Sequence, residues 1–247
     1  MARPADPHAR EALVHAARVE FVRAGVRGTR IEDITAACGL SKGAFYLHFP
    51  SKEALFGELV AGFRARTDAM LERRKTQLAR FFVEHGPLSA RDVKVKSPRY
   101  ERLLKLETAA DRETLETLWE YRDVFGVLMS GCQGTEFQGL VWEFAGREMT
   151  RVQDDFEAVK ACGACRTDVP SELFGSMMIG TYLLVAQQMS QMKARPDLDA
   201  WVIALHRLIR EGIAPVETPK GKLKPALSRA EGVRRSLAAR ESRRAVS

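Results

Sequence analysis

The sequence lacks the features that mark membrane and secreted proteins. None of the apolar runs in its 247 residues approaches the roughly 18 residues that a transmembrane helix needs. The first ten residues contain no apolar segment of the kind found in signal peptides. Because the mean hydropathy is −0.23, we expect a soluble globular protein that stays in the cytoplasm and has no membrane partner.

The sequence also lacks the motifs of common enzyme classes. It has no glycine-rich phosphate loop, no His-Glu-x-x-His metalloprotease motif and no nucleophile elbow. We therefore expect neither an enzyme nor a bound cofactor. Only four cysteines are present, and cytosolic proteins rarely keep structural disulfides, so we expect no disulfide framework.

Strand-like alternation of apolar and polar residues is absent, and so are internal repeats of about 20–50 residues. Apolar residues at helical spacing fill most of the chain instead, which predicts an all-α fold with roughly nine helices in two domains. The first predicted helix begins at Asp6 and Pro7 and ends at Gly25, and two short helices follow between residues 29 and 49. The later predicted helices cover residues 51–82, 99–130, 135–161, 170–194 and 198–212. The polar residues 88–98 predict a loop.

The net charge of +7 is unevenly distributed along the chain. Residues 216–247 contain nine basic and three acidic residues, whereas the remaining 215 contain 30 basic and 29 acidic residues. The overall charge is therefore no argument that the folded part binds DNA. Residues 215–247, rich in proline, glycine, serine and basic residues, predict a disordered basic tail.

Residues 29–52 predict two short helices separated by a tight turn. Thr29 and Glu32 have the spacing of a capping box, in which two side chains satisfy free N–H groups at the start of a helix. Gly39 suits the position after the first helix, where the backbone turns left-handed, and Ser41 suits the N-cap of the second. Two helices joined by a three-residue turn containing glycine have the geometry of a helix-turn-helix motif.

The second of these helices, residues 41–49, has one apolar side and one open side. Phe45 and Phe49 lie four residues apart and can anchor the apolar side in a core. The open side presents Lys42, Gly43, Ala44, Tyr46, Leu47 and His48. A helix that reads DNA places its N-terminal residues against base edges in the major groove. The open side is thus a candidate DNA-binding surface, although helix-turn-helix geometry also occurs in proteins that never contact DNA.

Residues 8–56 resemble the DNA-binding domain of the TetR/AcrR family of bacterial transcriptional regulators. The resemblance rests on Phe21, Gly25, Thr29, Ile34, the continuous run from residue 39 to residue 49, Lys52, Leu55 and Phe56. It covers about a fifth of the chain. The sequence departs from the family pattern at Arg30, where a small hydroxyl residue is usual, and at Thr35, where alanine is usual.

The resemblance implies which residues contact DNA. In this family the residues that match Thr29, Lys42, Gly43, Tyr46, His48 and Lys52 do so. At Arg30 we expect an additional phosphate contact. The predicted DNA-binding residues are therefore Thr29, Arg30, Ser41, Lys42, Gly43, Ala44, Tyr46, Leu47, His48 and Lys52.

The resemblance also implies the organisation of the whole chain and its partners. It implies an N-terminal three-helix helix-turn-helix domain in residues 1–52, and a helical effector-binding and dimerisation domain in residues 53–214. Residues 215–247 remain as the basic tail. The implied function is a homodimeric regulator, most often a repressor, that a small-molecule effector releases from double-stranded operator DNA. When bound to DNA, such a protein is associated with the nucleoid.

Two surfaces of the second domain are candidates for these partners. Aromatic and methionine side chains predict an effector pocket lined by Trp119, Phe125, Met129, Trp142, Phe144 and Met149. Apolar stripes on the last two helices predict a dimer face containing Leu173, Met177, Gly180, Leu184, Met192, Trp201, Leu205, Leu208 and Ile209. The alternative for both sets is burial within the core of one subunit.

Cys162 and Cys165 leave a second hypothesis open. Their C-x-x-C spacing suits a redox disulfide or half of a metal site, but a zinc site needs two further ligands and no second such pair exists. A DNA-binding redox or metal sensor is therefore the alternative to the effector-responsive regulator. A third hypothesis, an enzyme with an accessory helix-turn-helix, predicts a catalytic constellation that the sequence does not contain.

Overall fold

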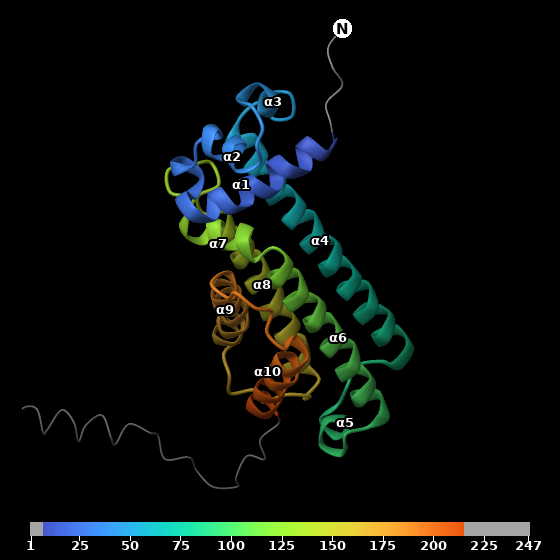
Figure 1. The fold of residues 1–247 in the computed structure, drawn as a ribbon. Coiled ribbons are helices and arrows are strands. Elements are labelled where there is room, and N and C mark those ends of the chain that lie inside the picture. The colour runs from blue at the N-terminus through green and yellow to red at the C-terminus, as the bar shows by residue number, and fades with distance from the viewer. Residues whose placement is uncertain (1–6, 215–247) are drawn as a thin grey trace, which may run out of the picture. The chain divides into compact units, whose positions relative to one another are not determined.

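The structure is a computed structural model that describes residues 7–214. These residues form ten helices and no strand (Figure 1). The helices are α1 (Pro7–Gly28), α2 (Ile31–Ala37), α3 (Lys42–Tyr46), α4 (Lys52–His85), α5 (Ala90–Val95), α6 (Pro98–Glu120), α7 (Arg122–Ser130), α8 (Leu140–Ala161), α9 (Ser171–Ser190) and α10 (Leu198–Ile213). The predicted all-α fold is confirmed for this part of the chain. The predicted tail, residues 215–247, lies outside the described residues.

Helices α1, α2 and α3 pack together at one end of the described residues, and α4 leads away from them alongside α6 (Figure 1). Ser51 begins α4, since its side chain accepts a hydrogen bond from Ala54 N at 3.0 Å, and Gly86 ends it with a φ of 68°. The predicted long helix is therefore confirmed and extends to His85. The predicted domain boundary at residue 52 falls at the first residue of α4, and that boundary stays a prediction.

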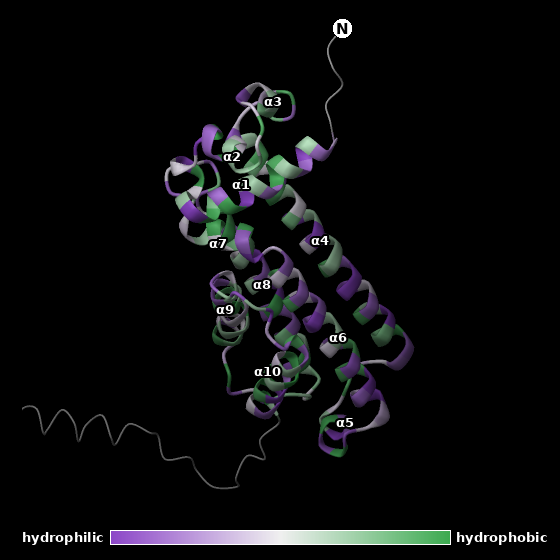
Figure 2. Ribbon diagram, viewed as in Figure 1, coloured by the Kyte–Doolittle hydropathy of each residue, from purple (hydrophilic) through white to green (hydrophobic). Residues whose placement is uncertain are grey.

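One large apolar core joins the N-terminal helices to α7. It contains Phe21, Phe45 and Phe49 together with Phe56 of α4 and Phe125 of α7. In Figure 2 the apolar colour is densest where α1, α2 and α7 meet, while α4 carries many polar residues. Burial of these rings is the main stabilising contribution at this end, because each large apolar side chain contributes about 1.5–3 kcal/mol when fully buried.

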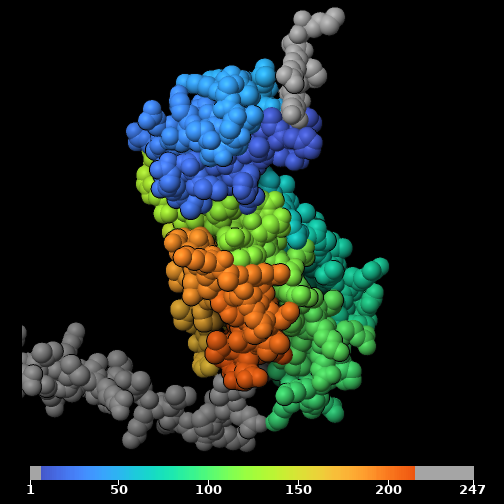
Figure 3. Space-filling model, in the orientation of Figure 1, coloured from blue at the N-terminus to red at the C-terminus, as the bar shows by residue number. Residues whose placement is uncertain are grey.

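A buried polar network joins α4, α6 and α10. Arg74 Nη1 donates to Asp111 Oδ1 at 2.7 Å, and His206 Nε2 lies 2.6 Å from the other oxygen of the same carboxylate. Burial raises the pKa of Asp111, but the hydrogen bond to His206 and the charge of Arg74 outweigh it and hold that pKa below its ordinary value. The network therefore fixes α4 against two later helices. In Figure 3, α10 lies on the visible face, away from the N-terminal helices.

Several of the predicted element boundaries are wrong, among them the end of the helix predicted over residues 170–194, since α9 ends at Ser190. Residues 88–98 contain the helix α5, which begins with a capping box formed by Ser89 and Asp92. The prediction of a loop is wrong because these capping residues are polar, as loop residues are. The predicted helix over residues 99–130 is interrupted at Tyr121, between α6 and α7. Residues 135–139 are not helical, and α8 begins only after Gly139, whose φ is 91°. No helix in the described residues is both long and apolar enough to cross a membrane.

Candidate DNA-binding surface

The turn between α2 and α3 closes as the sequence predicts. Gly39 has a φ of 68°, and the N–H groups of Gly39 and Leu40 donate to carbonyls in the last turn of α2 at 3.3 and 2.9 Å. This is the Schellman arrangement, in which a left-handed glycine satisfies the free carbonyls at a helix end. Ser41 then caps α3, since its Oγ accepts from Ala44 N at 3.1 Å. The helix pair therefore has the predicted helix-turn-helix connection.

Helix α3 is shorter than the predicted span of residues 41–49, but its two sides divide as predicted. The side chains of Phe45 and Phe49 are fully buried, and their ring centroids lie 5.7 Å apart. Tyr46 and Leu47 are 51% and 64% exposed. The two phenylalanines thus fix the orientation of α3, so that Lys42, Gly43, Tyr46 and Leu47 lie open on its outer side and Ala44 and His48 are half-buried.

An open groove connects α2, α3 and the start of α4, and we call it the α2–α3–α4 groove. Its volume is about 410 Å³. The residues that line it are Arg27, Thr29, Arg30, Ile31, Glu32, Lys42, Tyr46, Pro50, Ser51, Lys52 and Glu53. Of the predicted set, the structure therefore brings five residues around one groove, namely Thr29, Arg30, Lys42, Tyr46 and Lys52. Ser41, Gly43, Ala44, Leu47 and His48 are not among its lining residues.

Thr29 has a structural position that the sequence did not predict. It is fully buried, and its Oγ1 donates to the carbonyls of Glu20 and Gly25 at 3.0 and 2.7 Å. Arg30, not Thr29, occupies the N-cap of α2, and no side chain caps it there. The predicted capping box between Thr29 and Glu32 is therefore wrong. The hydroxyl group of Thr29 is buried and already bonded, and the prediction that this residue contacts DNA stays a prediction.

The ammonium group of Lys52 forms hydrogen bonds within the protein. Its Nζ donates to the carbonyls of Arg27 and Thr29 at 2.9 and 2.6 Å, and its side chain is 19% exposed. The first carbonyl belongs to the last turn of α1 and the second to the connection between α1 and α2. Lys52 therefore holds the first turn of α4 against that connection, at one side of the α2–α3–α4 groove.

Lys42, at the first position of α3, is paired with Glu32 of α2. The Lys42 Nζ lies 2.7 Å from Glu32 Oε1, and both side chains are about half exposed. The hydrogen bond from Lys42 lowers the pKa of Glu32, and the same bond raises the pKa of Lys42. The sequence analysis assigned Glu32 to capping and missed this pair. Its only sequence signal is the opposite charge of two residues on facing helices.

Arg27 and Arg30 are the basic residues of the groove that remain available. Both are exposed, and among residues 7–214 neither guanidinium group has a hydrogen-bond or ion-pair partner. Arg30 was predicted as a contact residue, but Arg27 was missed. Arg27 reaches the groove because the chain turns at Gly25, where the backbone leaves the helical conformation with φ 68° and ψ 173°.

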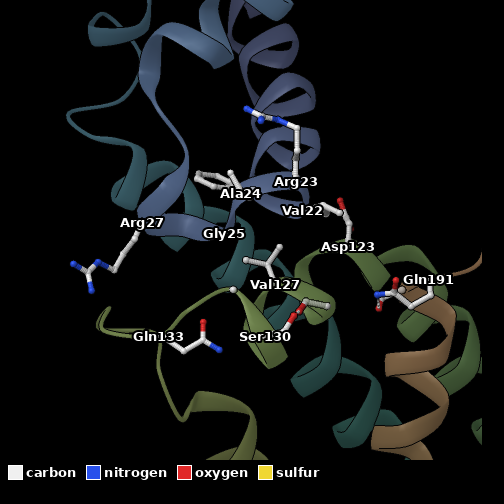
Figure 4. A pocket seen from close by; sticks show the side chains of 14 residues that line it. Val22, Arg23, Ala24, Gly25, Arg27, Asp123, Val127, Ser130, Gln133 and Gln191 are labelled. Atoms are coloured by element: carbon white, nitrogen blue, oxygen red, sulfur yellow. Dashed lines mark hydrogen bonds between the residues drawn. The ribbon is translucent and has the colours of Figure 1, made fainter.

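A second hollow lies between α1, α7 and the end of α9, where the N-terminal helices meet the rest of the fold. Its volume is about 330 Å³. Figure 4 shows Ser130, Gln133 and Gln191 on one side of it and Gly25 of α1 on the other. Close to it, Arg18 of α1 binds Asp123 of α7 through two hydrogen bonds of 2.5 and 2.7 Å. Burial raises the pKa of Asp123, but Arg18 outweighs burial and holds it below its ordinary value.

The backbone also connects α1 and α7 directly. Val26 N donates to Gly131 O at 2.9 Å. A Cβ atom at Gly25 would lie 2.9 Å from that same oxygen, so the close approach requires glycine. The start of the helix-turn-helix is thus fixed to α7 by both an ion pair and a backbone contact.

The six predicted effector-pocket residues do not form one site in this conformation. Phe125 is buried in the core shared by α1 and α7, Trp119 packs against a different cluster that includes Leu115, and Trp142 is 63% exposed. Met129, Phe144 and Met149 are not among the residues that line either hollow described above. Their assignment to an effector pocket stays a prediction.

Cys162 and Cys165 are both free thiols, the first exposed and the second buried. Burial raises the pKa of the Cys165 thiol, which disfavours the thiolate that redox and metal chemistry need. Among residues 7–214, no group of three or more His, Cys, Asp or Glu side chains is arranged to hold a metal ion. The geometry therefore gives the sensor hypothesis no support.

Comparison with known proteins identifies the N-terminal region. Residues 13–59 match the family model described as bacterial regulatory proteins, tetR family. The chain is 60% identical over 35 residues to the uncharacterized HTH-type transcriptional regulator YerO of Bacillus subtilis, covering 14% of this chain and 12% of that protein. It is 30% identical over 105 residues to the probable acrEF/envCD operon repressor of Escherichia coli, covering 39% of this chain and 46% of that protein. The matches thus span less than half the length of these curated relatives.

The fold comparison extends over most of the described residues. The ketosteroid transcriptional regulator KstR2 of Mycobacterium tuberculosis aligns with a TM-score of 0.60 at 16% identity, over 87% of this chain and 99% of that chain. At this identity the match shows a shared fold. The sequence match places residues 13–59 in the tetR family of bacterial regulatory proteins, and the fold comparison shows that the helical fold of the described residues is shared with a solved transcriptional regulator.

Proposed function

We propose that this protein is a dimeric, sequence-specific DNA-binding repressor of transcription that a small-molecule effector releases from its operator. It acts in the cytoplasm, on the nucleoid when bound to DNA. The observation that carries the proposal is the α2–α3–α4 groove, where exposed basic and phenolic side chains of three elements face the same open space. Relatives named as transcriptional regulators and repressors support it.

The outer side of α3 is suited to base contacts. Its first residues are Lys42, Gly43 and Ala44, and a Cβ atom at Gly43 would meet only Ser41 Oγ, at 3.7 Å. Open space above a glycine at the start of the helix permits close approach to base edges in the major groove. The Lys42 ammonium is then the group placed to donate to a guanine O6 or N7.

The rim of the groove is suited to phosphate contacts. Arg27 and Arg30 are exposed and unpaired, and the Tyr46 hydroxyl group belongs to a half-exposed side chain on the same groove. The N-terminus of α4, a 34-residue helix, opens onto it at Ser51. The free N–H groups and the dipole at such a helix end favour an anion. Phosphate contacts of this kind position the protein without specifying the sequence.

A face of α9 is suited to dimerisation, and Leu208 of α10 is also exposed. Leu173, Met177 and Leu184 of α9 are 61%, 47% and 71% exposed in the single chain. Together with Gly180, where a Cβ atom would have nothing within 4 Å, they lie on one side of the helix. Such a stripe on a soluble protein favours burial against a second copy. Met192, Trp201 and Ile209 of the predicted face pack within their own subunit instead.

Effector binding would reach DNA through the helices that connect the two regions. The 34-residue helix α4 starts at the groove and is held at Arg74 by the buried network with Asp111. The contacts between α1 and α7 form the second connection. A small movement of these helices would change the separation of two recognition helices in a dimer, and so the fit to two half-sites.

Selection of binding sequences tests the proposal. Purified full-length protein is incubated with random duplexes, and the bound fraction is sequenced after several rounds. We expect enrichment of a near-palindrome, since a two-fold symmetric dimer reads two related half-sites. Enrichment of no sequence, with the protein folded and dimeric, would contradict the proposed function.

A further inference from the structure

Glu32 is an acidic residue on a surface that we propose faces a polyanion. It lines the α2–α3–α4 groove together with Arg27, Arg30 and Lys42. Its carboxylate binds the Lys42 ammonium at 2.7 Å, and the side chains of Glu32 and Lys42 are 51% and 54% exposed. The pair therefore neutralises the first residue of α3 before DNA arrives.

Stability does not account for this pair. Ion pairs between exposed side chains contribute only about 0–1 kcal/mol, and salt screens them further. Glu32 also lies in the first turn of α2, where its carboxylate accepts from its own backbone N–H, but an acidic side chain there stabilises the helix only weakly and does not need Lys42 for it. A role in how the groove meets DNA explains its position better.

On non-cognate DNA, Glu32 has an unfavourable effect. If the Lys42 ammonium moves to a phosphate oxygen, the Glu32 carboxylate loses its hydrogen-bonded cation and keeps only the weaker effect of the Arg30 charge, close to the negatively charged backbone. Like-charge proximity of this kind suppresses wrong partners. Non-specific binding depends mainly on such phosphate contacts, so Glu32 weakens it.

On a cognate site the same carboxylate is compatible with binding. A lysine ammonium has three donors. It can keep Glu32 as one acceptor and donate a second bond to a base acceptor in the major groove, such as guanine O6 or N7. Glu32 then holds the Lys42 side chain along the open side of α3 instead of letting it turn to the phosphate backbone.

We propose that Glu32 is a specificity-determining residue, which directs the Lys42 ammonium to a base edge and penalises its contact with phosphate. This inference rests on the proposed function. It adds that discrimination between operator and random DNA depends on a carboxylate of α2 acting through one lysine of α3.

The test measures binding of full-length protein to two duplexes at several salt concentrations. One duplex carries the sequence enriched by selection, and the other is a random sequence of equal length. Glu32→Gln keeps the shape and removes the charge. We expect its affinity for random DNA to rise about fivefold to tenfold at 0.1 M salt, with a salt slope steeper by about one. Operator affinity should change less than about twofold, so the operator-to-random ratio falls.

Two control variants separate this role from a general effect of charge. Glu53→Gln removes a second carboxylate from the same groove, one that lies 3.8 Å from Lys52 and has no contact with Lys42. We expect it to leave the operator-to-random ratio unchanged. In a Lys42→Ala background, Glu32→Gln should change that ratio less than twofold. Melting curves confirm that each variant is folded.

Two outcomes would overturn the inference. If the operator-to-random ratio fell equally in Glu32→Gln and Glu53→Gln, any carboxylate in the groove would have the same effect. If Glu32→Gln lowered that ratio as much in the Lys42→Ala background as in the wild type, Lys42 would not be involved. Should the wild type select no sequence, the proposed function fails separately. The affinities for random DNA still test the inference in that case. A higher affinity of Glu32→Gln alone, and only when Lys42 is present, supports the role of the Glu32–Lys42 pair. Equal increases in affinity for Glu32→Gln and Glu53→Gln contradict that role.

Discussion

Adjacent residues at the start of α2 have opposite roles. Thr29 is fully buried with its hydroxyl group bonded to two carbonyls, whereas Arg30 is exposed on the groove. The family resemblance treats the position of Thr29 as a DNA contact, and sequence alone gives no sign that its side chain turns inward. Burial against α1 decides this, and burial depends on tertiary packing.

Substitutions at these two neighbours should therefore separate folding from binding. Thr29→Val keeps the shape and removes the hydroxyl donor from the carbonyls of Glu20 and Gly25, while Gly25 O keeps its bond from the backbone N–H of residue 29, so we expect the free energy of unfolding to fall by about 0.5–1.5 kcal/mol. DNA affinity of the folded fraction should not change. Arg30→Ala should weaken binding to all sequences and reduce the salt slope by about one, with unfolding unchanged. Urea unfolding and DNA titrations measure both, and reduced affinity in Thr29→Val with normal stability would contradict the assignment.

Gly25 and Gly86 offer a second comparison at the residue scale. Their backbone conformations are nearly identical, with φ 68° and ψ 173° at Gly25 and φ 68° and ψ 177° at Gly86. A Cβ atom at Gly25 would lie 2.9 Å from Gly131 O, whereas one at Gly86 would have nothing within 4 Å.

The difference in stability between the two alanine variants should show how much free energy the clash at the α1–α7 contact costs. Gly86→Ala should lower the free energy of unfolding by about 1–3 kcal/mol through backbone strain alone. Gly25→Ala adds the clash with Gly131 and should therefore lower the free energy of unfolding further. It should also reduce the affinity for the operator. Urea unfolding of both variants gives the difference. Equal stability losses would show that the α1–α7 contact adjusts without cost.

At the scale of elements, local signals predicted the helix-turn-helix well. Gly39, Ser41 and the buried pair Phe45 and Phe49 act within a few residues of one another, and the structure confirms each. The break at Tyr121 was missed because the apolar spacing continues through it. The ion pair of Lys42 with Glu32 and the inward position of Thr29 were missed because they depend on how helices pack.

The buried network joining α4, α6 and α10 gives a prediction that depends on pH. Asp111→Asn removes the charge that Arg74 and His206 share, and removing one partner of a buried ion pair should cost about 3–5 kcal/mol. Because the pKa of Asp111 is lower in the folded state, its contribution is complete above its unfolded value of about 3.9 and is lost as the pH falls through the folded value. Urea midpoints of wild type and variant should therefore stay apart from pH 7 to about pH 5 and converge only as the pH falls below about 3.9.

Asp155→Asn is the matched control for that network. Asp155 pairs with Arg151 on the surface of α8 at 2.7 Å and is 65% exposed. Its loss should cost less than about 1 kcal/mol at any pH. A similar small cost for Asp111→Asn would show that the buried network does not hold α4.

At the scale of the whole molecule, the proposed dimer determines whether two grooves can meet one operator. Leu184→Glu places a charge on the exposed stripe of α9 and should yield folded monomers that lose operator affinity. Val83→Glu is the control, since Val83 of α4 is 87% exposed and lies outside that stripe. Sedimentation velocity at micromolar concentration distinguishes the two. Dimers that persist in Leu184→Glu would place the interface elsewhere.

Titration of the selected operator with Gly43→Leu tests the central claim most directly, that the open side of α3 meets DNA. A leucine side chain has room at this position, because a Cβ atom would meet only Ser41 Oγ at 3.7 Å, and leaving glycine raises helix propensity by up to about 1 kcal/mol. We predict an unchanged or higher melting temperature and loss of operator binding by at least about 100-fold, since the side chain would keep α3 out of the major groove. Gly146→Leu, at another open helical glycine, should bind normally. Operator affinity of Gly43→Leu equal to that of the wild type would contradict the account.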